Sequence, residues 1–382
     1  MKQRLFAPGP VEVSVNHYKE TLDLSLNHRT PEFSELMREL VTLLKYSFDS
    51  TGEMFVFTSS GSGGMECSVA NLFSPEEKVL VVNTGTFGAR FLEIAKVHRL
   101  KTVELKPAEG NAVSSEEIEK ILNEQSDIKG VLVQFVDTST GIRNDIKKIG
   151  KITSNRDVML VVDGVSGLIA NEYSHDKYKV DASISASQKG FESPPGLSFL
   201  TFSKRAMDRI NKREDIGTFY FGIKKMKKFM DESCQTPFTP AINLIKPLIS
   251  KIREIKEDGL EKNVEKHRVV AESIRAGIIA IGLEIFTEEN SRCDTLTPVR
   301  IPEGISAKNI QTKMRDEYGY IIAGGQGELA GKIIRLGHIG NIDIFDSLGM
   351  FGALEISLKE EGLEFETGIG VKAILNKYME IK

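Results

Sequence analysis

The chain has 382 residues, with 50 basic and 54 acidic side chains and a net charge of -4. This length exceeds the ~100 to 200 residues of one typical domain, and 40% hydrophobic with 27% charged residues is the composition of a folded protein, so we expect two domains. Because the net charge is negative, no global positive field attracts nucleic acid or an anionic membrane, and we expect neither as a partner.

The sequence also argues against a membrane span, export and a metal framework. Its longest nearly uncharged apolar stretch, at 276–283, is far shorter than the ~20 residues that a spanning helix needs. Pro8 and Pro10 interrupt the basic start before any apolar segment forms, which is untypical of a signal peptide. The cysteines are odd in number and widely spaced, at Cys67, Cys234 and Cys293. This spacing predicts a reducing compartment, the cytoplasm, with no disulfide or bound metal.

Between residues 53 and 202, short apolar runs alternate with segments of helical periodicity. The runs lie at 53–57, 78–82, 102–105, 130–136, 158–162, 182–186 and 197–202. Strands that are apolar on both faces need helices on both sides of the sheet. The pattern therefore predicts an α/β fold with a mostly parallel sheet in a three-layer α/β/α arrangement.

A serine- and glycine-rich turn, SSGSGGMEC at 59–67, follows the first of these strands. If a helix begins there, its free backbone N–H groups and the hydroxyls of Ser59, Ser60 and Ser62 form a cradle for phosphate. The turn lacks the GK[ST] ending of a nucleotide-binding P-loop. Flexible connections have the same composition, so this motif does not decide the function alone.

Further polar or aromatic residues follow the next strands of the sheet. Phe87 comes just after the run at 78–82, where an aromatic side chain either covers a planar ligand or packs in the core. Thr138 and Ser139 follow the run at 130–136, where their hydroxyls either bond a ring oxygen or cap a helix.

The most informative pair is Asp163 and Lys189, which lie 26 residues apart at the ends of two apolar runs. The carboxyl ends of parallel strands meet at one edge of a sheet, where open α/β folds bind ligands. A buried acid there holds a heterocyclic nitrogen protonated, and a lysine among small residues forms a Schiff base with an aldehyde. The alternative is a turn-capping aspartate and a surface lysine. Together with the phosphate cradle, the pair indicates pyridoxal phosphate chemistry.

After about residue 240 the chain changes to long charged helices, followed by a strand at 295–301 and an amphipathic helix that ends near 360. Arg335 ends the apolar run KIIRLG, where its planar guanidinium either binds a carboxylate or forms a structural ion pair. We expect an N-terminal segment at 1–20 that packs with a small α+β domain at 246–382, and a large cofactor-binding domain at 21–245.

Ten ordered motifs resemble the class V aminotransferases of pyridoxal phosphate fold type I, nearest the serine–pyruvate and alanine–glyoxylate aminotransferases. They cover nearly the whole chain and lie at 7–14, 27–33, 59–66, 83–90, 137–146, 161–167, 185–190, 194–199, 235–244 and 335–343. The resemblance implies an enzyme that binds pyridoxal 5′-phosphate and works as a homodimer with shared active sites.

The resemblance also implies a role for each matching residue. Lys189 would form the Schiff base, and Asp163 would pair with the ring nitrogen. Phosphate contacts would come from Ser60, Gly61, Ser62 and Gln188, and from the partner subunit through Gln235, Thr236 or Thr239. Phe87 would stack on the ring, Thr138 or Ser139 would contact its hydroxyl region, and Arg335 with the Gly9 backbone would receive the substrate carboxylate.

Three residues depart from the family pattern near the ring and the substrate. Phe87 stands where the family often has tryptophan, Phe135 where it has histidine, and Asp137 where glutamate is commoner. The resemblance favours alanine or serine as amino donor and glyoxylate or pyruvate as acceptor in a ping-pong reaction. Aspartate or phosphoserine stays open as donor, with His28, Arg29 and the KKMKK run at 224–228 as candidate second cations.

Two other functions are weighed against the transaminase. A lyase or cysteine desulfurase shares this fold type, but the segment 320–337 before and around Arg335 has no cysteine to act as nucleophile. A binding or assembly subunit without activity is also compatible with the fold. The presence of Lys189, Asp163 and Arg335 together argues against it.

Overall fold

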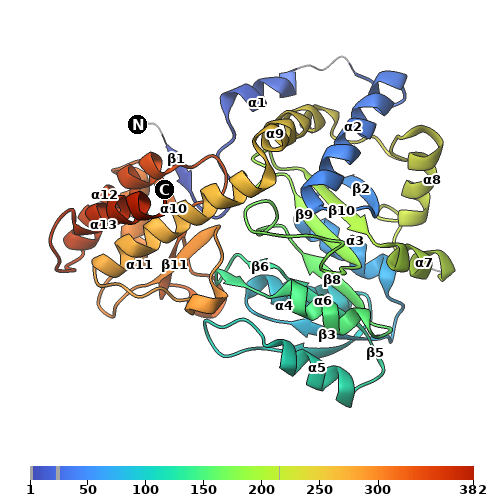
Figure 1. Ribbon diagram of the computed structural model, residues 1–382, viewed down its shortest axis with the longest axis horizontal. Helices are drawn as coiled ribbons and strands as arrows, with labels where there is room; N and C mark the ends of the chain where they lie inside the picture. The colour runs from blue at the N-terminus through green and yellow to red at the C-terminus, as the bar shows by residue number, and fades with distance from the viewer. Residues whose placement is uncertain (1–2, 23–25, 215) are drawn as a thin grey trace.

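The computed structural model describes residues 3–22, 26–214 and 216–382. Its largest element is a seven-stranded sheet in the order β2-β10-β9-β8-β5-β3-β4 (Figure 1). Neighbouring strands are parallel except β10, which is antiparallel to both β2 and β9. The prediction of a mostly parallel sheet is confirmed. The strands are β2 (Glu53–Thr58), β3 (Lys78–Val82), β4 (Lys101–Leu105), β5 (Ile128–Gln134), β8 (Met159–Asp163), β9 (Ala182–Ala186) and β10 (Leu197–Phe202).

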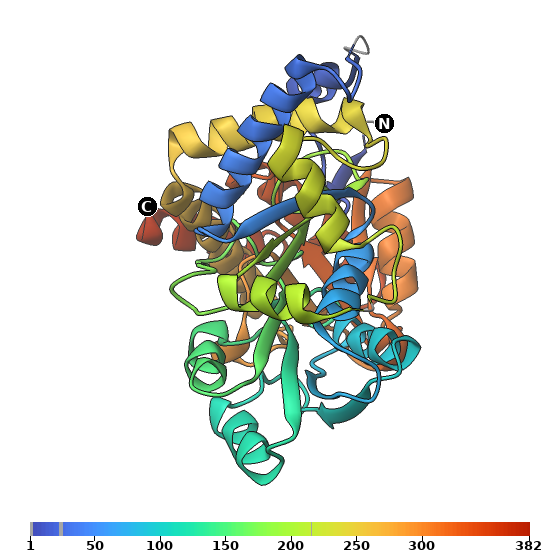
Figure 2. The same cartoon turned by 90° about the vertical axis from the view of Figure 1, so that its right-hand side faces the viewer.

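Helices cover both faces of this sheet, as Figure 2 shows in a view turned by 90°. Side chains alternate between the faces, so that Val161 packs in the core below α3 and Leu160 packs in the core below α6. One face carries α3 (Gly61–Leu72), α4 (Thr86–Val97), α7 (Lys204–Lys212) and α8 (Ile223–Ser233). The other carries α2 (Pro31–Phe48), α5 (Ser115–Glu124), α6 (Ile146–Ser154) and α9 (Ile245–Asp258). The three-layer prediction is therefore confirmed.

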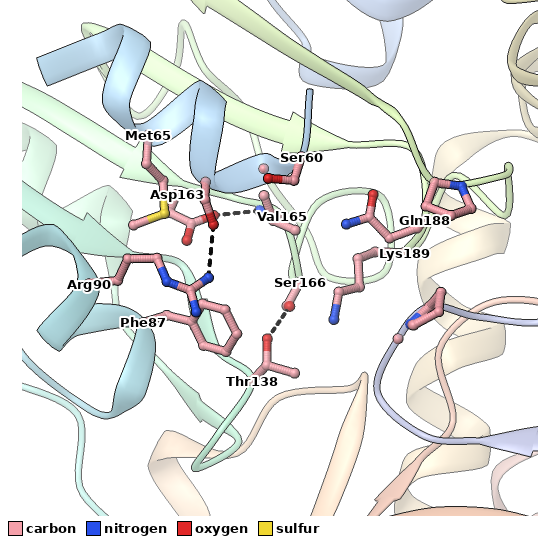
Figure 3. Close-up of a pocket in the computed structure, with 15 residues that line it drawn as sticks. Ser60, Met65, Phe87, Arg90, Thr138, Asp163, Val165, Ser166, Gln188 and Lys189 are labelled. Carbon is pink, nitrogen blue, oxygen red and sulfur yellow. Dashed lines mark hydrogen bonds between the residues drawn. The ribbon is translucent and has the colours of Figure 1, made fainter. Parts of the chain in front are cut away.

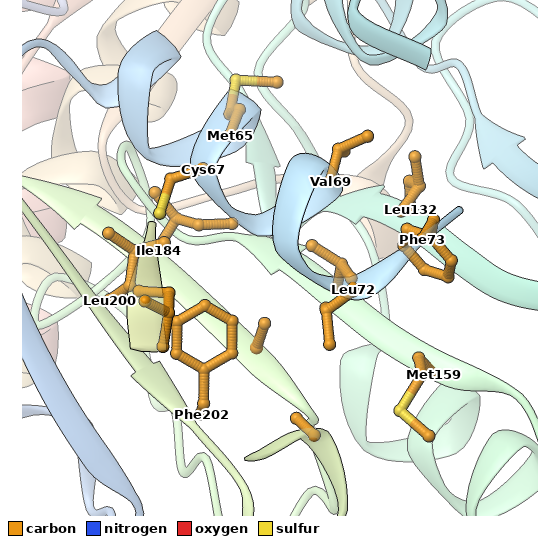
Figure 4. Packing of buried hydrophobic residues seen from close by; sticks show 14 of the residues in the cluster. Met65, Cys67, Val69, Leu72, Phe73, Leu132, Met159, Ile184, Leu200 and Phe202 are labelled. Carbon is orange, nitrogen blue, oxygen red and sulfur yellow. The ribbon is translucent and has the colours of Figure 1, made fainter. Parts of the chain in front are cut away.

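Helix α3 is held close to the sheet because its inner face is small and apolar. A Cβ atom at Gly64 would lie 2.6 Å from Cγ2 of Ile184 on β9, so only glycine fits there without a shift. Further along the helix, larger side chains fill the space between α3 and the strands (Figure 4). They are Met65, Cys67, Val69 and Leu72, which pack with Ile184, Leu200 and Phe202. This packing fixes where the first turn of α3 lies.

A second sheet, of four strands in the order β1-β12-β13-β11, lies beside the large one (Figure 1). Its strands are β1 (Arg4–Phe6), β11 (Leu296–Arg300), β12 (Tyr320–Gly324) and β13 (Ile333–Gly337). It shares a core with α10 (Leu260–Ala280), α11 (Ala307–Asp316), α12 (Ile344–Glu360) and α13 (Ile369–Ile381). Because β1 pairs in parallel with β12, the N-terminal segment joins a sheet made from the C-terminal third. We propose that the chain divides into domains as its sequence predicts, at 1–20, 21–245 and 246–382.

The segment after β5 differs from the expected single strand at 130–136. β5 ends at Gln134, and a short hairpin follows, formed by β6 (Val136–Asp137) and β7 (Ile142–Arg143). The break arises because Phe135 N–H bonds to the Asp163 carbonyl while Asn144 N–H bonds to the Phe135 carbonyl, which turns the chain out of the sheet. None of the helices in the described part of the chain is long and apolar enough to cross a membrane.

Candidate active site

A cavity of about 270 Å³ lies at the carboxyl ends of the parallel strands (Figure 3). Its volume is near the lower end of the ~300 to 1,000 Å³ range of small-ligand pockets. It brings together residues from seven of the ten sequence motifs. The lining residues are Gly9, Pro10, Ser60, Gly61, Ser62, Met65, Phe87, Arg90, Thr138, Asp163, Val165, Ser166, Gln188, Lys189 and Pro195.

The wall formed by the start of α3 has the properties of an anion site. Ser60 is the N-cap residue, and its side chain makes no capping hydrogen bond. The first N–H groups of a helix have no partner within the helix, and the positive end of the helix dipole lies there. The side-chain oxygen Oε1 of Gln188, another lining residue, is buried without a hydrogen-bond partner. The free N–H groups at the start of α3 fit a bound phosphate, whereas Oε1 of Gln188 is an acceptor, so a hydrogen bond from this side chain to phosphate would come from its Nε2.

Asp163 is the last residue of β8 and is buried, with 5% of its surface exposed. Its Oδ1 accepts a hydrogen bond from the Val165 N–H at 3.0 Å. The pKa of the Asp163 carboxyl is raised to about 6, chiefly by burial and also by the nearby Asp137 carboxylate, against the lowering effects of the Val165 N–H, Arg90 and Lys189. An ionised acid in this position is a suitable partner for a protonated heterocyclic nitrogen.

Lys189 follows β9 and enters the cavity from the side opposite Asp163 (Figure 3). Its Nζ donates a hydrogen bond to the carbonyl oxygen of Pro8. The pKa of the Lys189 amine is lowered to about 8, chiefly by burial and also by Arg335, while Asp163 acts in the opposite direction. A substantial fraction of this amine is therefore neutral near neutral pH, which is the form that attacks an aldehyde or removes a proton.

Asp137 and Ser139 organise the turn that holds Phe87. Oδ2 of Asp137 accepts from the backbone N–H groups of Phe87 and Gly88, each at 3.1 Å, and its Oδ1 accepts from Ser139 Oγ at 2.6 Å. Ser139 Oγ in turn accepts from the N–H of Thr86 at 2.8 Å. Ser139 consequently supports the cavity wall without lining it. Of the two hydroxyl residues that the sequence offers at this place, Thr138 is the one in the cavity.

Arg335 lies on β13 just behind the Thr138 wall and is outside the set of lining residues. Its Nε donates to the carbonyl of Gly324 at 2.7 Å, and its Nη1 donates to the carbonyl of Thr138 at 2.8 Å. Burial lowers the pKa of its guanidinium, and the Asp137 carboxylate opposes this shift. The arginine thus joins the small sheet to the cavity wall and makes no ion pair at hydrogen-bond distance among the described residues.

The three residues expected to serve a neighbouring subunit do not line this cavity. Gln235 donates from Nε2 to Ser34 Oγ at 3.1 Å, and Arg29 donates to the Thr236 carbonyl at 2.7 Å. Thr239 Oγ1 lies 3.5 Å from Nε2 of His28. Of the candidate second cations, His28 and Arg29 therefore belong to this turn. The KKMKK run lies on α8, outside the cavity.

The cavity contains two polar residues that the sequence interpretation did not assign. Ser166 forms a short hydrogen bond with Thr138. Arg90 places its guanidinium 4.6 Å from the centre of the Phe87 ring and donates to Ser62 Oγ at 2.9 Å. The sequence did contain a pattern that points to Arg90. It lies three residues after Phe87 in α4, and residues three apart lie on the same face of a helix.

Comparison with known proteins identifies the family. The aminotransferase class-V model matches residues 13–330. An uncharacterized aminotransferase of Methanocaldococcus jannaschii is 35% identical, covering 99% of this chain and 98% of its own. Two further relatives are each 29% identical. The match to the L-aspartate–glyoxylate aminotransferase of Paracoccus denitrificans covers 98% of this chain and 96% of the relative. The match to the serine–glyoxylate aminotransferase of Methylorubrum extorquens covers 97% of this chain and 95% of the relative.

Solved structures agree with this assignment. The ureidoglycine–glyoxylate aminotransferase of Bacillus subtilis superposes with a TM-score of 0.94 at 27% identity, over 99% of this chain and 98% of its own. The alanine–glyoxylate aminotransferase of Nostoc sp. gives a TM-score of 0.87 at 26% identity, over 100% and 95%. The family model matches most of this chain, the fold is that of pyridoxal phosphate fold type I, and one cavity contains a lysine and an aspartate. This chain belongs to the class V aminotransferases.

Proposed function

We propose that this chain uses pyridoxal 5′-phosphate to move the amino group of alanine or serine to glyoxylate or pyruvate. The observation that carries the proposal is the placement of Lys189 and Asp163 on opposite sides of one cavity, beside the uncapped start of α3. A phosphorylated pyridine with an aldehyde has one group for each of these features. The residues present therefore fit the cofactor that the family uses.

The proposed contacts follow from the walls of the cavity. Ser60, Gly61, Ser62 and Gln188 hold the phosphate at the start of α3. Asp163 faces the ring nitrogen, Phe87 lies along the ring, and Thr138 reaches the ring hydroxyl. When bound, the cofactor supplies an aldehyde that exchanges between two amines and a protonated ring that stabilises negative charge at the substrate carbon.

The chain's own residues then control where protons move. Lys189 reaches the aldehyde from a buried position, and the amine that substrate releases remains beside the α-carbon as a general base. Its lowered pKa allows that amine to accept the α-proton and to return it at the neighbouring carbon. Asp163 keeps the ring nitrogen charged during both transfers. Product leaves before the second substrate enters, so we expect ping-pong kinetics.

Substrate selection is proposed to depend on Arg335 and the Gly9 backbone. A planar guanidinium matches a carboxylate with two hydrogen bonds, and the contact of Arg335 with the Thr138 carbonyl on the cavity wall supports this proposed role. Besides Lys189, the cation among the lining residues is Arg90, which lies toward Asp163 and Ser62. A donor with a second anionic group has no partner on the substrate side of the described cavity, which favours alanine and serine. Aspartate remains the alternative because one relative carries it in its name.

A homodimer with shared active sites is part of the proposal. Phe219 is 75% exposed, and the centre of its ring lies 5.4 Å from that of Phe238. Phe238 belongs to the turn that also carries Gln235, Thr236 and Thr239. Such exposed aromatic groups are typical of interface centres. The turn makes hydrogen bonds to the end of β2, where the Ala241 N–H donates to Thr58 Oγ1 at 2.8 Å. We propose that this turn reaches the phosphate site of a second copy. A location in the cytoplasm is also part of the proposal, in agreement with the three free thiols.

The desulfurase alternative has little support from the cavity. Cys67, Cys234 and Cys293 are absent from its lining, and burial raises the pKa of the Cys67 thiol, which opposes a nucleophilic role. A binding subunit without activity would retain the fold but would not need a lysine amine of lowered pKa buried opposite an aspartate.

A half-reaction screen tests the proposal. The protein is loaded with pyridoxal phosphate, each amino acid is added alone, and the near-ultraviolet absorbance of the cofactor is followed. We expect alanine and serine to convert it fastest, with one oxo acid released per site until glyoxylate is added. Lys189→Ala is the control and should not react. Failure of the wild-type chain to bind the cofactor would overturn the activity, and faster reaction with aspartate would overturn the substrate choice.

A further inference from the structure

Arg90 is the one permanently charged cation among the lining residues of the cavity, and the proposed reaction gives it no task. We propose that Arg90 is a positioning residue that keeps the Asp163 carboxylate ionised and holds the Phe87 ring in the orientation that accepts the cofactor. The proposal rests on the function proposed above, and it adds to that function a residue on which cofactor binding depends.

The geometry ties Arg90 to both neighbours. It lies on α4 one turn after Phe87, so its guanidinium returns over the phenyl ring, with the Cζ atom 4.6 Å from the ring centre. Nη1 donates to Ser62 Oγ at 2.9 Å, which orients the guanidinium toward the start of α3. Figure 3 shows the guanidinium between the Phe87 ring and the Asp163 side chain. A cation over an aromatic face is attracted by the negative face of the ring, so this contact holds the two side chains together.

Asp163 needs such a cation more than its neighbour Asp137 does. Asp137 receives hydrogen bonds from the backbone N–H groups of Phe87, Gly88 and Ser139 and from the Ser139 hydroxyl. For the Asp163 carboxylate a single hydrogen bond is found in the described part of the chain, from the Val165 N–H. Two buried carboxylates near each other disfavour ionisation of the less solvated one. Asp163 is therefore the carboxylate whose charge state depends on its surroundings.

Three cations face this pair, and they are not equivalent. The Lys189 amine donates a hydrogen bond to the Pro8 carbonyl, and because the pKa of this amine is about 8, it is partly neutral. Arg335 is directed to the carbonyls of Thr138 and Gly324, and its charge acts on Asp137 and Lys189. Arg90 carries a full charge at every relevant pH and acts on Asp163 directly, lowering the pKa of that carboxyl against the effects of burial and Asp137.

The first test uses the protein without cofactor. A carboxyl whose pKa is higher in the folded state stabilises the fold below its unfolded pKa, and this contribution is lost as pH rises through the folded pKa. The difference in unfolding free energy between wild type and Asp163→Asn should thus change up to about pH 6 and then level off. In an Arg90→Gln background, the pH at which this difference levels off should rise by about one unit. The reason is that Asp163 loses a nearby positive charge, so its pKa increases.

The second test measures the affinity for pyridoxal phosphate by absorbance or fluorescence titration at pH 7. Arg90→Gln should weaken binding by about twofold at pH 7, because a rise of about one unit in the Asp163 pKa lowers the ionised fraction of that carboxyl from about nine-tenths to about half. Arg90→Lys keeps the charge and should retain most of the affinity, together with the wild-type pH profile of Asp163. Arg38→Gln removes an exposed arginine on α2 and is the matched control, with no expected change.

The outcomes separate this proposal from the proposed function. If wild type does not bind pyridoxal phosphate, the function fails and the affinity test has no baseline, whereas the pH test without cofactor still decides the role of Arg90. If wild type binds and Arg90→Gln leaves the Asp163 profile unmoved, the positioning role is overturned. If Arg90→Gln and Arg90→Lys weaken the affinity for pyridoxal phosphate equally and the pH profile of Asp163 does not shift, Arg90 acts only by packing against Phe87. That result would also overturn the positioning role.

Discussion

The Lys189 amine donates a hydrogen bond to the carbonyl of Pro8, although the two residues are 181 positions apart. The contact forms because β1 carries the N-terminal segment into the small sheet, and because the Val11 N–H then bonds to the carbonyl of Gln188 at 3.1 Å. The N-terminal segment consequently forms one wall of the cavity. The position of the lysine depends on a segment that the large sheet does not contain.

Gly9→Ala should impair the site more than the fold. Gly9 has φ +128°, and a Cβ atom there would lie 2.5 Å from Nζ of Lys189. We expect the lysine to be displaced and the affinity for pyridoxal phosphate to fall by tenfold or more, on the order of 1.4 kcal/mol. Gly282→Ala is the control, because its φ is +79° and nothing lies within 4 Å of the added atom. Equal affinity of the Gly9 variant and wild type would contradict the contact.

Reconstitution with pyridoxal phosphate should accelerate as pH rises. The amine of Lys189 must be neutral to attack an aldehyde, and its pKa is lowered to about 8 by burial and Arg335. The neutral fraction, and with it the rate of cofactor attachment to the cofactor-free protein, should have a midpoint near pH 8. Stopped-flow absorbance measures this rate. A midpoint above pH 10, the ordinary range of a lysine, would show that the amine is exposed to water.

The buried ion pair of Glu192 and Lys251 should be strongly coupled. Their charged groups are 2.9 Å apart with side chains 1% and 7% exposed, and the Glu192 N–H bonds to the Lys189 carbonyl. Lys251→Met should cost about 3 to 5 kcal/mol, because Glu192 is left buried without its partner, whereas Glu192→Gln should cost less, because Lys251 keeps its ion pair with Glu254 at 2.6 Å. The double variant should cost less than the sum of the two.

Chemical denaturation of the four proteins in this cycle measures the coupling. Arg253→Gln, which breaks an exposed pair with Glu39, is the control and should change stability by less than about 1 kcal/mol. Additive losses in the double variant would mean that the two charges act independently.

Gly64→Ala should move the phosphate cradle. The added methyl group would lie 2.6 Å from the Ile184 side chain, so α3 must shift away from β9. Overpacking of this kind costs about 1 to 3 kcal/mol, and we expect weaker binding of both pyridoxal phosphate and inorganic phosphate. Gly352→Ala in α12 is the matched helix control, since nothing lies within 4 Å of its Cβ. That control should stabilise the protein by about 0.5 to 1 kcal/mol.

Phe219→Lys should weaken the proposed dimer. The wild-type ring is 75% exposed in one chain, and Nζ of Lys225 already lies 4.6 Å from its centre. A second ammonium group there would repel Lys225 and remove the apolar contact. Sedimentation velocity should show a dimer for wild type and a larger monomer fraction for the variant. A wild-type monomer, or an unchanged dimer in the variant, would contradict an interface at this turn.

The sequence by itself determined the layered fold and most of the site. An apolar run becomes buried on both faces of a sheet whichever segment comes after it in the chain. For this reason the sheet could be predicted from the composition of its strands alone. The ends of parallel strands meet at one edge, which is why Asp163 and Lys189 line one cavity as expected. The reversed direction of β10 was not predicted, because an apolar run has the same composition in either direction.

Only the tertiary structure decided which polar groups share the cavity and which charges they feel. Ser139 and Thr138 are adjacent in the chain, yet one supports the wall and the other lines it, because the Asp137 carboxylate accepts hydrogen bonds from both the N–H and the hydroxyl of Ser139. The placement of Arg90 over Phe87 and beside Asp163 depends on how α4 packs against α3. Electrostatic effects of this kind depend on distance and burial in space, and a linear sequence specifies neither until the chain has folded.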